Sequence, residues 1–246
     1  SVVDPSRDQN SLILLKKGAW TGVTDVTSAV MTRLADENGG KSPADVGDLC
    51  VYQTTRVVDG KSYLLASFHG DTNGLATVPV VDAVHNYRKH DLDGSDTWSL
   101  VFGLDANTYF NCVDDNGVKK RACVVDFAES FKAHQLNSVY GDSSASPDDY
   151  GHTTFNARTY LQPQLNKAVK AADKTTSPLV DKNPKDFILF YDADFKLSGA
   201  TAKDNTGLGD FVPDMVFPTL SFPSDHAITR ATLVDKNFDD LQVAAA

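Results

Sequence analysis

The chain has 246 residues, of which 41% are hydrophobic and 23% charged, with a formal net charge of −10 and an isoelectric point near 4.9. These values are ordinary for a globular domain, and the acidic excess argues against a protein that holds long nucleic acids through their phosphates. The apolar runs are too short to cross a bilayer, and no signal peptide is visible.

The first part of the chain predicts alternating strands and helices. Gly39-Gly40 would end a helix, Asp59-Gly60 is typical of a hairpin turn, and a proline is tolerated in the first turn of a helix. The expected elements are a buried strand at 11–17, a helix at 23–40, a hairpin at 48–70 and a helix at 75–90.

The second part is less regular, and several of its strands end in polar residues. We expect a layered α/β protein with a site at the strand ends, formed by a single domain over residues 1–246, since no repeat or linker divides the chain. The expected elements are a short strand that starts at 97 and stops at Gly103, mixed strand and helix signals at 123–134, a loop at 140–152, a helical tendency at 159–177, a buried strand at 185–195, a loop at 202–215 and a final strand within 222–233.

Two of the three cysteines flank a tight-turn signal. Cys112 and Cys123 lie on either side of Asn116-Gly117, so their flanks are expected to run antiparallel and bring the cysteines together. A disulfide can form there. Cys50 would then be either a small buried hydrophobe or a partner for a thiol outside the chain.

Four stretches place polar side chains where a strand begins or ends. Each one alone is more often structural, because a histidine after an apolar run is commonly buried and satisfied, and an Asp-x-Asn commonly forms a turn. Together they indicate a site. The stretches are LLASFHGD with His69, LVFGLDAN with Asp105 and Asn107, KDFILF with Asp186, and FPSDHA with Asp225 and His226.

The residue types in these stretches suit acid–base chemistry. His226 needs a partner that fixes its tautomer, and Asp186, at the start of a neighbouring strand, can supply it. Asp105 and Asn107 are two apart and are expected on one side of an extended strand end. A carboxylate and an amide there would provide an acceptor for a water proton and a donor for a developing anion.

In order, FHG, GLDAN, KDFI and PSDHA resemble the later motifs of the endonuclease/exonuclease/phosphatase (DNase I-like) superfamily, over roughly residues 48–235 by element spacing. PSDHA and the Asp-x-Asn are the most specific, although GLDAN departs from the commoner Gly-Asp-x-Asn. The resemblance implies a four-layer α/β sandwich, in which two packed mixed sheets are flanked by helices, lacking its first strands in this chain.

The resemblance also implies a role for each residue. His226 would act in general acid–base catalysis, oriented by Asp186, and Asp105 would position or deprotonate the attacking water. Asn107 and His69 would stabilise the phosphoryl oxygens. The reaction would be in-line attack of water on a phosphoester.

The metal ligands of the family are only partly present. The resemblance places Asp225 and Asp105 near a divalent cation, usually Mg²⁺, with Mn²⁺ or Ca²⁺ as alternatives. The family's N-terminal Asn and Glu ligands are not found, and Glu37 lies at an expected helix end rather than on a strand. The missing part can be a separate, still-associated fragment of the same precursor, or the sequence can be incomplete. The third alternative, which we favour less, is a divergent member that has lost catalysis.

The expected function is a divalent-metal-dependent phosphoesterase, either a phosphodiesterase or a phosphatase, acting on a small phosphorylated substrate. The alternatives are a catalytically inactive family member that serves as a binding or structural subunit, and a secreted nuclease. A secreted or organellar location is favoured over the cytoplasm. Arg158 and Lys167 are candidate phosphate-binding residues, although the exposed face of an ordinary helix would explain them equally well.

Overall fold

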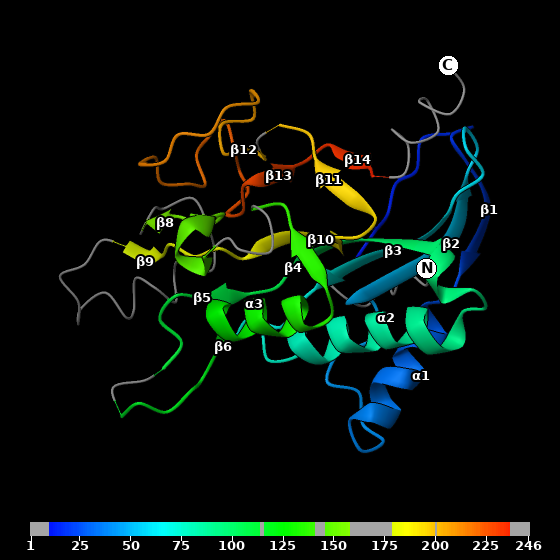
Figure 1. Ribbon diagram of the computed structural model, residues 1–246. Helices are drawn as coiled ribbons and strands as arrows, with labels where there is room; N and C mark the ends of the chain where they lie inside the picture. Colours follow the sequence, from blue (N-terminus) through cyan, green and yellow to red (C-terminus); the bar gives the residue numbers. More distant parts are fainter. Residues whose placement is uncertain (1–9, 114–115, 141–145, 158–178, 200, 237–246) are drawn as a thin grey trace.

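A six-stranded mixed sheet forms the central layer of the structure (Figure 1). The computed structural model describes residues 10–113, 116–140, 146–157, 179–199 and 201–236. In spatial order, the strands of the sheet are β1 (Trp20–Asp25), β2 (Leu49–Arg56), β3 (Ser62–His69), β4 (Trp98–Asp105), β10 (Asp186–Tyr191) and β7 (Leu136–Ser138). All neighbouring pairs are antiparallel except β3 and β4.

Three helices cover one face of this sheet: α1 (Thr27–Glu37), α2 (Thr77–Asp91) and α3 (Val124–Ala133) (Figure 1). Helix α2 connects the parallel strands β3 and β4. The alternation of side chains along β3 follows from the strand period of two. Leu64 and Phe68 pack in the core under the helices, whereas Tyr63 and Leu65 pack in a second core on the opposite face.

Short two-stranded sheets cover the opposite face of the central sheet. β11 (Phe195–Leu197) pairs with β14 (Leu233–Asp235), and β12 (Ala202–Asp204) pairs with β13 (Ile228–Arg230). Phe195 and Leu233 close the second core against Tyr63 and Phe190. The α/β sandwich is therefore confirmed, and in the described residues its second layer consists of these short pairs. The remaining short elements are β5 (Thr108–Tyr109), β6 (Ala122–Cys123), β8 (Asn156–Ala157), β9 (Leu179–Asp181) and the 3₁₀ turns Ser95–Thr97 and Pro147–Tyr150.

Several expected elements are confirmed. The hairpin at 48–70 is β2 and β3, the helix at 75–90 is α2, and the buried strand at 185–195 contains β10. Cys112 and Cys123 form a disulfide, with their Cα atoms 5.1 Å apart. Cys50 is buried in β2, as the first of its two alternatives predicts. None of the helices in the described ranges combines the length and apolar character that a bilayer crossing requires.

The buried strand expected at 11–17 is wrong. Residues 10–16 join no sheet, and Leu12 and Leu14 are 58% and 85% exposed. Ile13 and Leu15 pack against the second core. The segment therefore at least partly buries every second side chain, but it does not pair with a strand of any sheet. The helix expected at 23–40 is also too long, because its first residues belong to β1 and the helix starts only at Thr27.

The strand expected to stop at Gly103 continues to Asp105. Gly103 is paired on both sides, with Ser67 of β3 and Ile188 of β10, so a strand neighbour on each flank outweighs the weak β propensity of glycine. The mixed signals at 123–134 resolve into the end of β6 followed by α3, and the loop expected at 202–215 begins with β12. The helical tendency at 159–177 lies outside the described residues.

Gly74, between β3 and α2, fixes how closely this turn approaches the end of β4. Its φ is +68°, and a Cβ there would lie 2.5 Å from the carbonyl oxygen of Asn107 and 2.6 Å from that of Ala106. Gly60 has a similar φ of +70°, but a Cβ there would meet nothing within 4 Å. Of these two glycines, Gly74 alone combines the left-handed backbone with a close approach to neighbouring backbone atoms.

We predict that Gly74→Ala destabilises the protein more than Gly60→Ala. The left-handed backbone alone should lower the free energy of unfolding by about 1 kcal/mol in both variants, and the clash at Gly74 should add about 1–3 kcal/mol. Urea denaturation of the two variants measures the difference. Equal losses would show that the turn moves freely away from Ala106 and Asn107.

Candidate active site

The ends of three neighbouring strands bring His69, Asp105 and Asp186 into one row. The register pairs His69 of β3 with Asp105 of β4, and Asp105 with Asp186 of β10. Residues directly opposite each other in a sheet project from the same face, so the three side chains lie side by side. His69 Nε2 is 3.5 Å from Asp105 Oδ2. Because β4 continues past Gly103 to Asp105, its pairing with β3 and β10 places the three side chains in one row.

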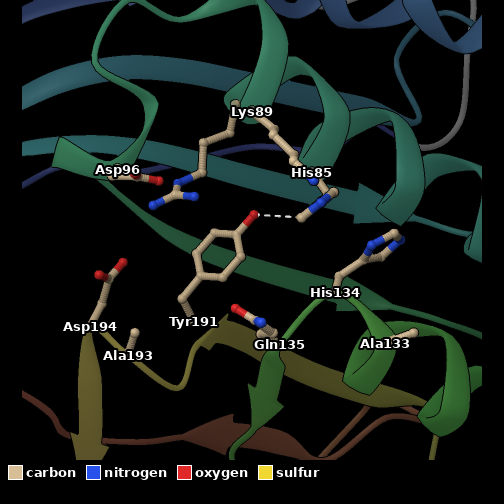
Figure 2. A pocket seen from close by; sticks show the side chains of 10 residues that line it. His85, Lys89, Asp96, Ala133, His134, Gln135, Tyr191, Ala193 and Asp194 are labelled. Carbon is tan, nitrogen blue, oxygen red and sulfur yellow. Dashed lines mark hydrogen bonds between the residues drawn. The ribbon is translucent and has the colours of Figure 1, made fainter.

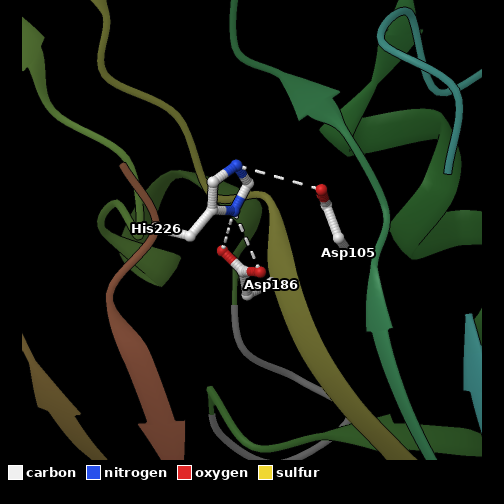
Figure 3. A group of neighbouring side chains, drawn as sticks. All are labelled: Asp105, Asp186 and His226. Carbon is white, nitrogen blue, oxygen red and sulfur yellow. Dashed lines mark hydrogen bonds and ion pairs between the residues drawn. The ribbon is translucent and has the colours of Figure 1, made fainter. Parts of the chain in front are cut away.

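His226 reaches this row from the second layer. Its Nδ1 lies 2.9 and 3.1 Å from the two carboxylate oxygens of Asp186, and its Nε2 lies 3.9 Å from Asp105 Oδ2 (Figure 3). One imidazole edge is thus held by Asp186 while the other faces Asp105. The ring stands between the two acids.

Thr153 holds the two layers in this position. Its Oγ1 accepts hydrogen bonds from the backbone N–H groups of Lys185 and Asp186, both at 3.0 Å, and its carbonyl oxygen accepts the Ala227 N–H at 2.8 Å. Thr153 is fully buried. A single residue therefore fixes both the start of β10 and the residue that follows His226.

Asn107 contacts Asp105 by a different geometry from the one expected. Its φ is 46°, so the chain leaves β4 through a left-handed turn and not through an extended strand end. The Asn107 N–H donates to Asp105 Oδ1 at 3.0 Å, and its Nδ2 donates to Asp105 Oδ2 and to the Gly70 carbonyl oxygen, both at 3.1 Å. Asparagine tolerates this backbone better than most residues. Asn107 thus positions the Asp105 carboxylate.

Burial and mutual charge shift the pKa values of the two groups that face each other. Burial, together with the charge of Asp186, raises the pKa of Asp105 to about 6, although His226 opposes the shift. Burial by itself would lower the pKa of His226. The hydrogen bond to Asp186 and the charges of Asp186 and Asp105 outweigh it and raise that pKa to about 9. At neutral pH, His226 is therefore an imidazolium, and the Asp105 carboxylate beside it is close to the pH at which it takes up a proton.

The donor atoms of Asp105, Asp186 and His226 lie within 4.8 Å of one another, as in a group that can hold a divalent cation. Mg²⁺ prefers six oxygen ligands in octahedral array. Both carboxylates already accept hydrogen bonds, Asp105 from Asn107 and Asp186 from His226. These residues therefore do not form a Mg²⁺ site by themselves.

The structure brings together the five residues expected to be catalytic. Asp225 is half-buried and acts on the pKa of His226 through its charge, but it is not a member of the group that could hold a cation, whereas Asp186 is. Glu37 ends α1 and pairs with Arg33. The two candidate phosphate-binding residues, Arg158 and Lys167, lie outside the described residues.

Sequence reasoning missed Thr153 and Lys203. Lys203 Nζ donates to the carbonyl oxygens of Tyr150 and His152 at 3.0 and 3.1 Å, which fixes the loop that carries Thr153. Burial lowers the pKa of Lys203 to about 8, against the charge of Asp186. Neither residue belongs to a recognisable motif, and no pattern in the sequence points to them.

Comparison with known proteins shows a likeness to solved structures alone. No family model matches the chain, and no curated protein matches its sequence. The catalytic domain of human Nocturnin, solved with a bound sulfate, is 14% identical over 76% of this chain and 52% of that one, with a TM-score of 0.41. This chain therefore spans about half of that domain.

Two further structures give similar values. TDP2 of D. rerio, solved with a single-stranded DNA product, is 12% identical over 87% of this chain and 68% of that one, with a TM-score of 0.43. An endonuclease/exonuclease/phosphatase from Bacteroides vulgatus is 14% identical over 90% of this chain and 68% of that one, with a TM-score of 0.46. All three likenesses are distant, with TM-scores below 0.5.

We predict that the His226 imidazole titrates near pH 9 and that Asp186→Asn lowers this pKa to about 6.5 or below. The substitution removes the negative charge and the carboxylate acceptor, while the burial that disfavours the imidazolium remains. NMR titration of the histidine ring signals measures both values. His85, whose pKa burial lowers to about 4, provides an internal signal that stays neutral across the range. A wild-type value at or below 6.5 would contradict the arrangement.

Proposed function

We propose that the chain is a phosphoester hydrolase that acts as a phosphodiesterase or phosphatase on a small phosphorylated substrate. The observation that carries this proposal is the placement of His226 between Asp186 and Asp105, with one ring nitrogen held and the other directed at a carboxylate. This is the arrangement that acid–base chemistry on a bound water needs. The net charge of −10 favours a small substrate over a long nucleic acid.

In the proposed mechanism, Asp105 accepts a proton from the attacking water. A carboxylate whose pKa is raised to about 6 is a better base near neutral pH than an ordinary aspartate. The His226 imidazolium, kept charged by Asp186, stabilises the negative charge on the phosphoryl group and can donate a proton to the leaving oxygen. His69, 3.5 Å from Asp105, is placed to contact a phosphoryl oxygen as well.

Asn107 has a narrower role than the motif resemblance implies. Its side-chain N–H groups already donate to Asp105 and to Gly70. We therefore assign it to holding the Asp105 carboxylate, and assign contact with the phosphoryl oxygens to His69 and His226.

We propose that Mg²⁺, or Mn²⁺ or Ca²⁺ in its place, supports this activity only when further oxygen ligands join Asp105, because Asp225, the other expected ligand, lies outside the group of converging donor atoms. An associated N-terminal fragment of the same precursor is the partner we propose for that purpose. Bound there, the cation would neutralise charge on the phosphoryl oxygens. Arg158 and Lys167 remain proposed contacts for the substrate phosphate. The disulfide between Cys112 and Cys123 supports a secreted or organellar location.

We predict that the chain, together with its associated N-terminal fragment, hydrolyses bis-p-nitrophenyl phosphate in the presence of Mg²⁺ and that His226→Ala lowers kcat/KM by about 100-fold or more. Asp186→Asn should lower it by about tenfold or more, because the imidazolium loses its partner. His90→Ala is the matched control, since His90 lies exposed in the last turn of α2 and should leave the rate unchanged.

Intact mass spectrometry of the native sample accompanies this assay and shows whether a second fragment is bound. A wild-type protein that carries the fragment and Mg²⁺ but hydrolyses nothing would contradict the proposal that the chain is a phosphoester hydrolase. The same result would favour the alternative of a binding or structural subunit.

The pH profile of kcat/KM tests the protonation states separately. Activity should rise as pH passes about 6, because Asp105 must lose its proton to act as the base, and fall as pH passes about 9, because His226 must keep its own. Asp186→Asn should move the falling limb to lower pH, and the rising limb should shift as well, because the charge of Asp186 contributes to the raised pKa of Asp105. A falling limb unmoved by Asp186→Asn would rule out His226 as its source.

A further inference from the structure

A cavity of about 370 Å³ lies at the end of the sheet opposite the candidate active site. Figure 2 shows His85 of α2, His134 after α3, and Tyr191 and Asp194 around it. Strand β10 has Asp186 at one end and Tyr191 at the other, so the two places are separated by roughly 17 Å at 3.4 Å per residue. The volume lies within the usual range for small-molecule sites.

A buried arginine that forms no close ion pair lies in one wall of this cavity. Arg88 is 9% exposed, its Nε donates to the carbonyl oxygen of Trp98 at 2.6 Å, and its guanidinium carbon lies 4.0 Å from the centre of the Tyr191 ring. Within the part of the chain that the structure describes, no carboxylate lies within ion-pair distance of Arg88. The charge of Asp194 acts on Arg88 from beyond ion-pair distance, and charged groups are rarely this buried without a closer partner, so the guanidinium can accept an anion as well.

A buried carboxylate with an unsatisfied oxygen forms the facing wall. Asp194 is 9% exposed, and its Oδ2 has no hydrogen-bond partner among the described residues. Its carboxylate lies on the same side of the Tyr191 ring as Asp96, and the two histidines lie on the other side (Figure 2). An unsatisfied buried oxygen is costly and requires a donor. The buried Ser99 hydroxyl is near enough to lower the pKa of Asp194 as a hydrogen-bond donor, although no hydrogen bond of normal geometry joins the two groups.

The charges that face the cavity balance. Burial and the neighbouring His134 lower the pKa of His85 to about 4, so His85 is neutral, and its Nδ1 is bonded to the Tyr191 hydroxyl at 2.7 Å. His134 is bonded through Nε2 to the Asp82 carboxylate at 2.7 Å. The remaining charged groups that line the cavity are Arg88, Lys89, Asp96 and Asp194. A ligand with separated positive and negative groups matches this set better than a simple anion.

We propose that this cavity binds a small zwitterion of the α-amino acid class, with its carboxylate on Arg88 and its ammonium group on Asp194. Arg88 and Asp194 both lie beside Tyr191, so one compact ligand can contact the two groups at the same time. The arginine fork binds a carboxylate through two hydrogen bonds, and the ammonium group satisfies the unpaired Asp194 oxygen. The site is independent of the proposed hydrolysis.

Four matched compounds test the proposal: L-alanine, L-lactate without the ammonium group, propionate without any donor there, and ethylamine without the carboxylate. Isothermal titration should find that alanine binds at least tenfold more tightly than propionate or ethylamine, with lactate between. In NMR spectra, alanine should shift the ring signals of His85, His134 and Tyr191 and leave those of His226 unchanged.

Substitutions in the cavity complete the test. Asp194→Asn should weaken alanine binding at least tenfold but change lactate binding little, and Arg88→Lys should weaken both. Lys89→Ala, at an exposed position, gives a folded comparator with a loss of about threefold, while Ser99→Ala and the distant Lys17→Ala should cause no loss. The proposal is overturned if alanine binds no better than propionate, if Asp194→Asn binds alanine as wild type does, or if the shifted signals belong to His226.

Discussion

The hydrogen bond between Asp186 and His226 is the contact on which the arrangement of the site depends, because it joins the two layers of the sandwich. Asp186 opens a strand of the central sheet, and His226 precedes a short strand of the second layer. Their atoms meet at 2.9 Å, and Thr153 helps to hold them there because it is hydrogen-bonded to the backbones of both segments. A change in the packing of either layer would therefore be felt first at this bond.

The same hydrogen bond reduces a charge repulsion that the sheet register creates. Asp105 and Asp186 are directly opposite each other on adjacent strands, and like charges in such a pair repel. The His226 ring between them can carry a positive charge, and its raised pKa is the other side of the same interaction. The row of acids thus requires the imidazolium, and the imidazolium in turn requires Asp186. We therefore expect that the loss of either the acids or the imidazolium would change the position of the other.

The sequence predicts elements better than the places where they meet. The hairpin around Asp59-Gly60 is local, and turn chemistry alone indicates it. The end of β4 is not local, because Gly103 stays in the strand only through neighbours that are distant in the chain. For the same reason the motif residues could be named from their order, whereas Thr153 and Lys203 could not, since their contribution is to hold backbone groups that only the folded chain brings near. At residues 11–17 the error is the opposite one: the apolar run predicts a strand, but no strand in the described part of the chain pairs with it.

The energetics of Asp105 argue that this site is used and is not an accident of packing. A carboxyl group whose folded pKa is about 6, against 3.8 when unperturbed, makes the ionised native state less stable above that pH by about 3 kcal/mol at most. The sign is unfavourable at neutral pH, because the unfolded chain releases this proton more readily than the folded one. An asparagine at the same place would avoid the charge and keep an oxygen that accepts the Asn107 N–H, although its amide nitrogen could not accept the second hydrogen bond, from Asn107 Nδ2. Groups held in this unfavourable state cluster at functional sites, and here the acid lies beside a histidine held by a second acid. A structural role for Asp105 would account for its burial, but it would not account for the open imidazole edge that faces it.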